Sequence, residues 1–361
     1  MNPTCQSRLV GTPFVRHPAS PVVSAELFPP GVLAFNPGVV DLGAELLMAV
    51  RIDHGIPGDP HITATDIAFA TSVDGLTWTA DPTRPTIDRA LAVDLLAAAE
   101  PHRDLDREVW RMYDPRLSVL DHPDGPLVMT TAVDTVHGLR AAVLGSADSG
   151  RSWKVVHLSM PDDRNIVLFP ETIGGAWFRL DRPFNEYGGE PLGAGRYGIW
   201  CSRSPDLRHW GEHRFLLGVD DLGIGNSKLG PGSPPIRTAR GWLCIVHAVE
   251  EHDDASGVVA RGWESSWRRR YVAGAMLLDL DDPSLVLAAC SEPVLEPVAD
   301  HETAGFRNDV VFPTGAVVRP SPTGDELWLY YGAADTCVGL AVAAVEDVVD
   351  FVLDHDRCVG S

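Results

Sequence analysis

Four basic residues stand out in a chain that is otherwise strongly acidic: Arg164, Arg182, Lys228 and His247. Each lies in a segment punctuated by Gly and Pro or at the end of an apolar, strand-like run. The formal net charge of the chain is −21, so a place that gathers cations would hold a small anion against the field of the whole protein. If that anion is phosphate, the chemistry can be phosphorolysis, in which phosphate replaces water as the nucleophile.

Taken singly, each basic residue also has an ordinary structural explanation. Arg164 and Arg182 follow aspartates in the sequence, and a surface ion pair of this kind is worth little. Lys228 stands beside a Gly/Pro segment, where a solvated lysine is common. His247 ends an apolar strand and is typical of a satisfied core histidine. The sequence alone does not bring the four residues together.

The candidate acid is Asp114, in the run Tyr113-Asp114-Pro115-Arg116. Pro115 favours an extended backbone at the residue before it. Tyr113 and Pro115 give the carboxyl group a partly apolar setting, which predicts a raised pKa and suits a general acid. The alternative is a turn aspartate that pairs with Arg116.

Composition excludes several classes of function. Asp and Glu number 50 against 29 Lys and Arg, which argues against nucleic-acid binding and against a polybasic membrane contact. No apolar run approaches membrane-spanning length, and the first residues lack a signal-peptide pattern. The cysteines have no zinc-site spacing, so we expect no metal and a reduced, cytoplasmic protein. They are Cys5, Cys201, Cys244, Cys290, Cys337 and Cys358.

The elements that must position these residues are mostly short strands separated by turn-forming residues. Apolar residues recur at helical spacing in residues 87–100, and a second short helix is expected at 345–353. Because helical segments do not alternate with strands, a parallel α/β fold is disfavoured. Examples of the expected strands are residues 45–50, 126–131, 241–246 and 326–331.

A loose repeat joins a strand, a Ser-x-Asp type of turn and a Trp that opens the next strand. Ser and Asp close such turns with local hydrogen bonds, and the Trp offers a large packing surface. A spacing of roughly 55–75 residues predicts a single all-β domain, residues 1–361, built as a five-bladed β-propeller with a few short helices in insertions. The copies lie at residues 67–78, 143–153 and 199–210, with degenerate copies at 273–279 and 338–343.

With these segments in order, the chain resembles glycoside hydrolase family 130, the β-mannoside phosphorylase family, from about Phe35 to Asp350. The family fold is a five-bladed propeller, in agreement with the repeat. The motifs that carry the resemblance are Phe35-Asn36-Pro37-Gly38, Tyr113-Asp114-Pro115-Arg116, Asn165 to Glu171, Arg182-Pro183-Phe184, Ser204 to Trp210, Lys228-Leu229-Gly230-Pro231-Gly232, Val311 to Gly315 and Tyr330 to Thr336.

The resemblance implies a role for each candidate residue. Asp114 matches the catalytic acid, and Asn36 and Asp335 match sugar contacts next to the cleaved bond. Inorganic phosphate is the implied co-substrate, with no other cofactor. One departure is Asp66, which stands where many members have an arginine and affects sugar contacts at that edge. The positions that match phosphate ligands are Arg164, Asn165, Arg182, Lys228 and His247.

The expected reaction is the inverting phosphorolysis of a terminal β-mannosyl linkage, which would release α-mannose 1-phosphate. Phosphate is already an anion, so one carboxyl group suffices where an inverting hydrolase needs two. One alternative is an inverting β-mannosidase in which Glu250 or Glu251 supplies the base. A second is a sugar-binding propeller without catalysis. Family members often assemble, so a homo-oligomer is possible.

Overall fold

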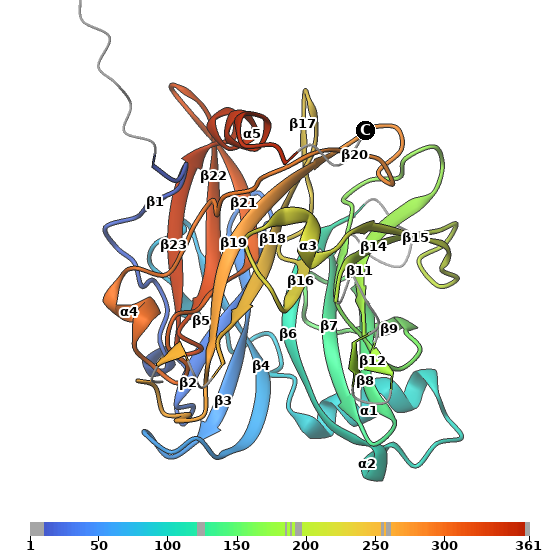
Figure 1. Cartoon of the computed structure of the whole chain (residues 1–361). Coiled ribbons are helices and arrows are strands. Elements are labelled where there is room, and N and C mark those ends of the chain that lie inside the picture. Colours follow the sequence, from blue (N-terminus) through green and yellow to red (C-terminus); the bar gives the residue numbers. More distant parts are fainter. Residues whose placement is uncertain are drawn as a thin grey trace, which may run out of the picture.

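The computed structural model describes residues 11–120, 127–184, 186–187, 190–191, 197–253, 256–257 and 261–357. Five antiparallel sheets succeed one another around the molecule as the blades of a propeller (Figure 1). The all-β, five-bladed prediction is therefore confirmed. Since each sheet follows the previous one in the chain, the repeat in the sequence is also the repeat of the fold.

The first sheet contains β2 (Leu33–Asp41), β3 (Leu46–Gly55), β4 (Ile62–Ser72) and β5 (Thr79–Ala80). The second contains β6 (Val109–Val119), β7 (Leu127–Thr135), β8 (Gly138–Ser146) and β9 (Lys154–Leu158). The third contains β10 (Asp163–Leu168), β11 (Trp177–Pro183), β14 (Ile199–Ser204) and β15 (Gly211–Leu217), with a separate hairpin of β12 (Glu186–Tyr187) and β13 (Glu190–Pro191).

The fourth sheet contains β16 (Lys228–Pro231), β18 (Gly241–Glu251), β19 (Arg269–Leu278) and β20 (Val286–Ala289), and β17 (Ile236–Thr238) also pairs with β18. The fifth contains β21 (Val311–Ser321), β22 (Gly324–Ala333), β23 (Cys337–Ala344) and β1 (Val15–Arg16). Because β1 pairs with β23, the fifth sheet joins the two ends of the chain and closes the ring.

Short helices lie in the connections. The expected helices at residues 87–100 and 345–353 are present as α1 (Arg89–Ala99) and α5 (Val345–Asp354). Asp88 caps α1 by accepting a hydrogen bond from the Leu91 amide at 2.8 Å, and Leu96 is buried against the second blade. The others are η1 (Ala25–Leu27), α2 (Leu105–Glu108), α3 (Val219–Leu222) and α4 (Asp300–Thr303).

Every copy of the sequence repeat falls on the third strand of a blade and the turn that follows it. In the first copy, the Ser72 hydroxyl donates to Asp74 Oδ1 at 2.9 Å, and the same oxygen accepts from the Thr77 amide at 2.8 Å. The Ser146–Asp148 and Ser204–Asp206 pairs repeat the hydroxyl contact at 2.9 and 3.2 Å. These three copies recur because the same turn leads to the outer strand of each of the first three blades. In the fifth blade β23 is followed by α5, and the outer strand is β1.

The inner strands of the first three blades share a bulge at their centre. Two residues on the inner strand stand opposite one on its neighbour, after Phe35, Tyr113 and Arg164 in turn. The next residue in each case has a left-handed backbone: Asn36 (φ 52°), Asp114 (φ 54°) and Asn165 (φ 57°). A bulge re-aims a side chain out of the regular alternation of the strand. Three blades therefore offer a polar residue at the same position of their inner strand.

Four described cysteines, Cys201, Cys244, Cys290 and Cys337, are buried free thiols. Cys5 and Cys358 lie outside the described residues. Among the helices of the described chain, none has the length and apolarity needed to cross a membrane. The described residues also contain no group of three His, Cys, Asp or Glu side chains that could hold a metal ion.

Candidate active site

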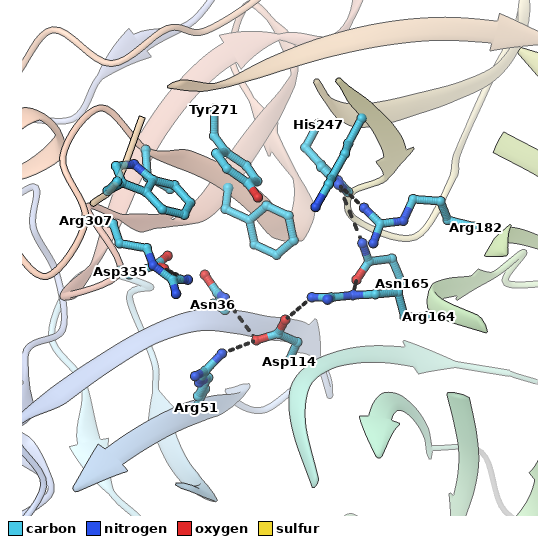
Figure 2. Close-up of a pocket in the computed structure, with 14 residues that line it drawn as sticks. Asn36, Arg51, Asp114, Arg164, Asn165, Arg182, His247, Tyr271, Arg307 and Asp335 are labelled. Carbon is cyan, nitrogen blue, oxygen red and sulfur yellow. Dashed lines mark hydrogen bonds and ion pairs between the residues drawn. The ribbon is translucent and has the colours of Figure 1, made fainter. Parts of the chain in front are cut away.

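One pocket collects residues from all five blades (Figure 2). All eight residues that the sequence marked as site candidates line it, although they come from segments up to about three hundred residues apart. The inner-strand bulges explain the convergence, because Asn36, Asp114 and Asn165 each occupy one. The lining residues are Asn36, Arg51, Asp114, Arg164, Asn165, Arg182, Lys228, His247, Trp267, Tyr271, Arg307, Val310, Phe312 and Asp335.

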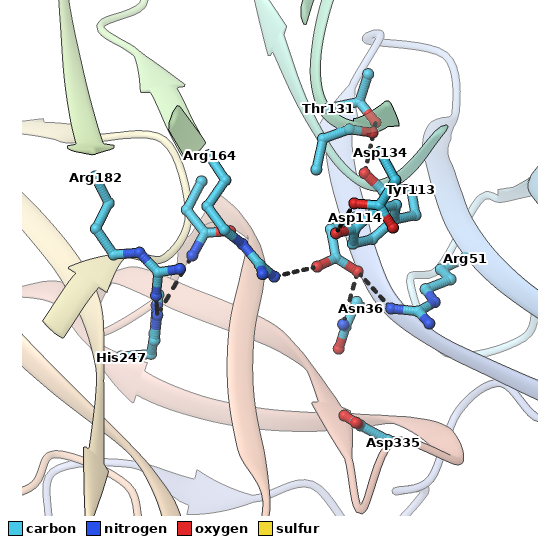
Figure 3. Close-up of polar contacts among 12 residues, drawn as sticks. Asn36, Arg51, Tyr113, Asp114, Thr131, Asp134, Arg164, Arg182, His247 and Asp335 are labelled. Atoms are coloured by element: carbon cyan, nitrogen blue, oxygen red, sulfur yellow. Dashed lines mark hydrogen bonds and ion pairs between the residues drawn. The ribbon is translucent and has the colours of Figure 1, made fainter. Parts of the chain in front are cut away.

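Asp114 lies at the centre of the polar contacts (Figure 3). Its side chain is 2% exposed. Oδ1 accepts a hydrogen bond from Asn36 Nδ2 at 2.9 Å and one from Arg51 Nη1 at 3.3 Å. Oδ2 lies 3.5 Å from Arg164 Nη2. The carboxyl group is thus held by donors from the first and third blades.

Two expectations for Asp114 were wrong. The pKa of its carboxyl group is lowered rather than raised, because the charges of Arg51, Arg164 and Arg116 outweigh the burial that would raise it. Its backbone is left-handed rather than extended, since it occupies the bulge of β6. Arg116 does not pair with the carboxyl group as the turn alternative supposed; its Nη1 donates to the Asp114 carbonyl at 2.9 Å.

A group of five residues, here called the cationic cluster, lines the pocket beside Asp114. Figure 2 shows four of them on one side of Asp114, and the fifth, Lys228, faces the same Tyr197 ring as Arg182. The cluster consists of Arg164 and Asn165 on β10, Arg182 on β11, Lys228 on β16 and His247 on β18. The third and fourth blades therefore supply the whole cluster.

Close backbone approach brings the two blades of the cluster together. Gly230 on β16 stands opposite His247 in the sheet. A Cβ atom on Gly230 would come within 2.5 Å of His247 Cε1 and 2.9 Å of Arg182 Cδ. Only glycine leaves room at this point for both side chains, so the glycine-rich run after Lys228 has a geometric reason.

His247 enters the cluster as a neutral group rather than as a cation. It is 0% exposed, and burial together with the charges of Arg182, Arg116 and Arg164 lowers its pKa well below the usual value. Its Nδ1 donates to the Pro231 carbonyl at 3.1 Å, because a carbonyl oxygen can only accept. Nε2 is then an acceptor, 3.5 Å from both Arg182 Nη1 and Asn165 Nδ2.

The true cations of the cluster repel one another. Burial and then the charges of Arg269, Arg182 and Arg164 lower the pKa of Lys228 to about 8. Burial and the charge of Arg164 lower the pKa of Arg182 to about 9. Aromatic rings partly offset this cost: the Tyr197 ring faces Lys228 Nζ at 5.3 Å and the Arg182 guanidinium at 5.8 Å. An anion would relieve the repulsion, so the cluster is built for negative charge.

The opposite side of the pocket has a different chemistry. Asp335 follows β22 with a left-handed backbone (φ 48°) and accepts a hydrogen bond from Arg307 Nη1 at 3.1 Å. Trp267 adds aromatic surface there, and Tyr271 and Phe312 continue the aromatic lining toward His247, whose ring centroid lies 4.6 Å from that of Phe312. Polar groups beside flat rings fit the hydroxyl groups and apolar faces of a sugar.

Several lining residues were missed from the sequence. Arg51 is the clearest, since it makes a bidentate pair with Asp53 (2.9 and 2.8 Å) as well as its contact with Asp114. It lies inside an apolar strand, and the only signal in the sequence was the presence of a charged residue in the middle of that strand. Asp66, which replaces the family arginine, does not line the pocket and pairs instead with His54 at 2.7 Å.

Comparisons with known proteins agree with this arrangement. A beta-1,4-mannooligosaccharide phosphorylase from Ruminococcus albus is 29% identical over 343 residues, which cover 94% of this chain and 91% of that protein. A beta-1,2-mannobiose phosphorylase from Listeria innocua serovar 6a is 40% identical over 176 residues, which cover 49% of this chain and 42% of that protein. The matched segment thus spans less than half of the Listeria enzyme.

The fold has solved counterparts. The structure of beta-1,2-mannobiose phosphorylase from Listeria innocua in complex with beta-1,2-mannobiose superposes with a TM-score of 0.73 at 24% identity, covering 94% of this chain and 99% of that one. The model of the Glyco_hydro_130 family, described as beta-1,4-mannooligosaccharide phosphorylase, matches residues 13–354. With a match over nearly its whole length, the chain belongs to glycoside hydrolase family 130.

Proposed function

We propose that the protein is an inverting β-mannoside phosphorylase, which uses inorganic phosphate to cleave a terminal β-mannosyl linkage and releases α-mannose 1-phosphate. The observation that carries this proposal is the separation of charge in the pocket. Among the described lining residues, only Asp114 and Asp335 bear carboxyl groups, and neither belongs to the cationic cluster. The cluster therefore fits an anionic nucleophile and holds no carboxylate base that could activate water.

Phosphate would bind in the cationic cluster. Arg164 and Arg182 present planar forks suited to bidentate phosphate contacts, and Lys228 adds a compact point charge. Asn165 can donate through its amide. The neutral His247 accepts through Nε2, so it can take a hydrogen bond from a protonated phosphate oxygen and orient Arg182. The cluster fixes the nucleophile on one side of the bound sugar.

The lowered pKa of Asp114 requires that its proton arrive with the substrates. In the empty pocket, Arg51 and Arg164 keep the carboxyl group ionised. Phosphate bound to Arg164 brings negative charge beside Asp114 and offsets that guanidinium, which raises the pKa of the acid. The monoanion of phosphate can supply the proton. Asn36 and Asp335 would contact the mannosyl unit beside the bond that breaks.

The bond changes then balance. A phosphate oxygen forms a bond to the anomeric carbon from the side opposite the leaving group, and the glycosidic C–O bond breaks. The proton held by Asp114 passes to the departing oxygen, directly or through a sugar hydroxyl, and Asp114 returns to its ionised state. The electron pair of the broken bond stays with that oxygen, which becomes a hydroxyl group of the released sugar.

The hydrolase alternative is less well supported. Glu251 accepts hydrogen bonds from Arg269 (2.9 Å) and from the Ser227 hydroxyl (3.0 Å), and Glu250 lies 3.8 Å from Arg270. Neither glutamate lines the pocket. A water activated by either residue would lie away from Asp114, so neither glutamate is placed as the base that an inverting hydrolase requires.

A substrate panel with and without phosphate tests the proposal. β-1,2- and β-1,4-linked mannobiose are incubated with the protein, and the products are followed by phosphorus NMR. We expect α-mannose 1-phosphate only when phosphate is present. Asp114→Asn should lose about 100- to 10,000-fold in rate while its thermal unfolding is retained. Free mannose formed equally fast without phosphate would overturn the proposal in favour of the hydrolase.

The proposal also covers the cellular compartment, the substrates and the oligomeric state. Buried free thiols in the described chain favour a reducing, cytoplasmic compartment. The substrates would be a β-mannoside and inorganic phosphate, and a homo-oligomer stays a prediction.

A further inference from the structure

Arg307 forms the wall of the pocket on the side away from the cationic cluster (Figure 2). It lies between α4 and β21, and its side chain is 33% exposed. Nε donates to Glu264 Oε2 at 2.7 Å, and Nη1 donates to Asp335 Oδ2 at 3.1 Å. Nη2 makes no hydrogen bond to the described residues. A guanidinium fixed at two nitrogens thus keeps donors free beside the pocket.

The surrounding chain holds this guanidinium rigidly. It lies over the Trp267 ring at 4.6 Å and over the Phe306 ring at 5.4 Å. The Arg307 amide donates to the Ala334 carbonyl at 3.0 Å, and Trp267 Nε1 donates to the Asn308 carbonyl at 3.0 Å. Three separate segments are joined in this way, so a ligand would meet a preformed surface and lose little entropy in ordering it.

The charges of this wall favour a neutral ligand. Two carboxylates, Asp335 and Glu264, face one guanidinium, which leaves the group with a net negative charge. A sugar that carries a carboxylate would be repelled. A sugar hydroxyl can accept from the free Nη2 donors of Arg307, while Asp335 Oδ1, which has no hydrogen bond to the described residues, is left to contact the mannosyl unit.

The position of the wall decides which sugar it meets. In an inverting displacement, the nucleophile and the leaving group lie on opposite sides of the anomeric carbon. The labelled residues of the cationic cluster lie on one side of Asp114, and Arg307 lies on the other (Figure 2). The Trp267 ring lies under the Arg307 guanidinium. We propose that Arg307 determines specificity for the leaving-group sugar, binding the hydroxyl groups of a neutral sugar that rests against Trp267. This inference rests on the proposed phosphorylase function.

In the reverse, synthetic reaction, the KM of the leaving-group sugar, which is now the acceptor, is measured separately from the KM of the mannosyl donor. Arg307→Ala is assayed in synthesis from α-mannose 1-phosphate and an acceptor, with mannose, glucose, N-acetylglucosamine and glucuronate compared. We expect the KM of the best neutral acceptor to rise by about 10- to 100-fold, because a hydrogen bond from a charged donor is lost. The KM of α-mannose 1-phosphate should change by less than about twofold. Glucuronate should be a poor acceptor for the wild-type protein.

Arg261→Ala is the matched control. Arg261 belongs to the connection between β18 and β19, which also carries Glu264 and Trp267; it is 70% exposed and does not line the pocket. It should leave both KM values unchanged. Equal increases in the two KM values for Arg307→Ala, or no increase in either, would overturn the inference, as would a preference of the wild type for glucuronate.

A failure of the proposed function would look different. It would appear as the absence of phosphate-dependent cleavage by the wild-type protein. In that case the inference is decided by calorimetric binding of β-mannobiose to wild type and Arg307→Ala. Weaker binding by the variant supports it, and equal affinity contradicts it.

Discussion

Arg164 Nη2 lies 3.5 Å from Asp114 Oδ2, so one guanidinium joins the cationic cluster to the proposed acid (Figure 3). The same charge that would bind phosphate also lowers the pKa of Asp114. Occupation of the cluster by an anion must weaken this effect. The acid is therefore coupled to the nucleophile site: it becomes easier to protonate only when an anion is bound.

This coupling predicts proton uptake when an anion binds. Sulfate is a suitable probe because it stays doubly charged above about pH 4 and brings no proton. Sulfate bound at pH 5 should raise the pKa of Asp114 and draw protons from solution. The uptake is measured by titration calorimetry in two buffers of different ionisation enthalpy. Asp114→Asn, which keeps the cluster, should take up fewer protons; equal uptake by both proteins would contradict the coupling.

The lowered pKa of Lys228 predicts the pH above which phosphate binding weakens. Burial and three neighbouring arginines lower its pKa to about 8, so its charge is present below that pH and is lost as the pH rises through it. The KM for phosphate should rise by up to about tenfold between pH 8 and pH 9, where phosphate itself is already a dianion. In Lys228→Arg the guanidinium stays charged, and the profile should be flatter.

The exposed Lys154 on β9 offers the control for that profile. Lys154→Arg makes the same chemical change away from the pocket, and the rise in KM above pH 8 should persist. A wild-type KM that does not change from pH 7.5 to pH 9 would show that Lys228 is not a phosphate ligand.

The sequence predicted the architecture well because the fold repeats. The first three blades reuse one turn between their third and fourth strands, and Ser, Asp and Trp mark that turn in a single sequence. All eight candidate residues line one pocket, although the role of each stays a prediction. The left-handed bulges that aim Asn36 and Asp114 were not predicted, because a bulge depends on the pairing with the neighbouring strand, although Asn and Asp tolerate this backbone better than most residues.

The electrostatics of the site were harder to predict. The pKa of Asp114 depends on Arg51, Arg116 and Arg164, and two of these come from other blades. Its immediate sequence neighbours, Tyr113 and Pro115, suggested the opposite shift. Local sequence describes the first neighbours of a residue, whereas in a propeller the charges around the pocket arrive from segments far apart in the chain.

The close packing around Gly230 predicts that a single methyl group added at this residue disrupts the proposed phosphate site. In Gly230→Ala, the new Cβ would overlap with His247 and crowd Arg182, and both side chains would have to move. Displacements of about 1 Å at such sites cost up to about 100-fold in rate. We expect kcat/KM for phosphate to fall by about 10- to 100-fold. Gly211→Ala, whose Cβ meets nothing within 4 Å, should leave it unchanged.

Gly230→Ala must still be folded for this comparison. Its circular dichroism spectrum and its affinity for β-mannobiose are measured alongside, because the sugar side of the pocket does not contact Gly230. A variant that keeps the wild-type kcat/KM for phosphate would place the phosphate site elsewhere.

The raised pKa of Asp163 predicts how the free energy of unfolding depends on pH. It precedes Arg164 but faces a different neighbour, Arg179, whose Nη2 lies 3.9 Å from Asp163 Oδ2. Burial and the charge of Asp181 raise the pKa of Asp163 to about 7, above the value of about 4 for an unfolded chain. Between these values the folded protein binds more protons than the unfolded one, so the stability contributed by this group falls as the pH rises from about 4 to about 7.

Asp163→Asn removes that titration, because an amide stays neutral throughout. The variant should unfold at a Tm several degrees higher than the wild type at pH 8 and should show no such gain at pH 4. Asp325→Asn, at an exposed position on β22, should change neither value. If the difference between Asp163→Asn and the wild type is the same at both pH values, Asp163 is already ionised at low pH. Repulsion between Asp163 and Asp181 would then not lower the stability of the folded protein.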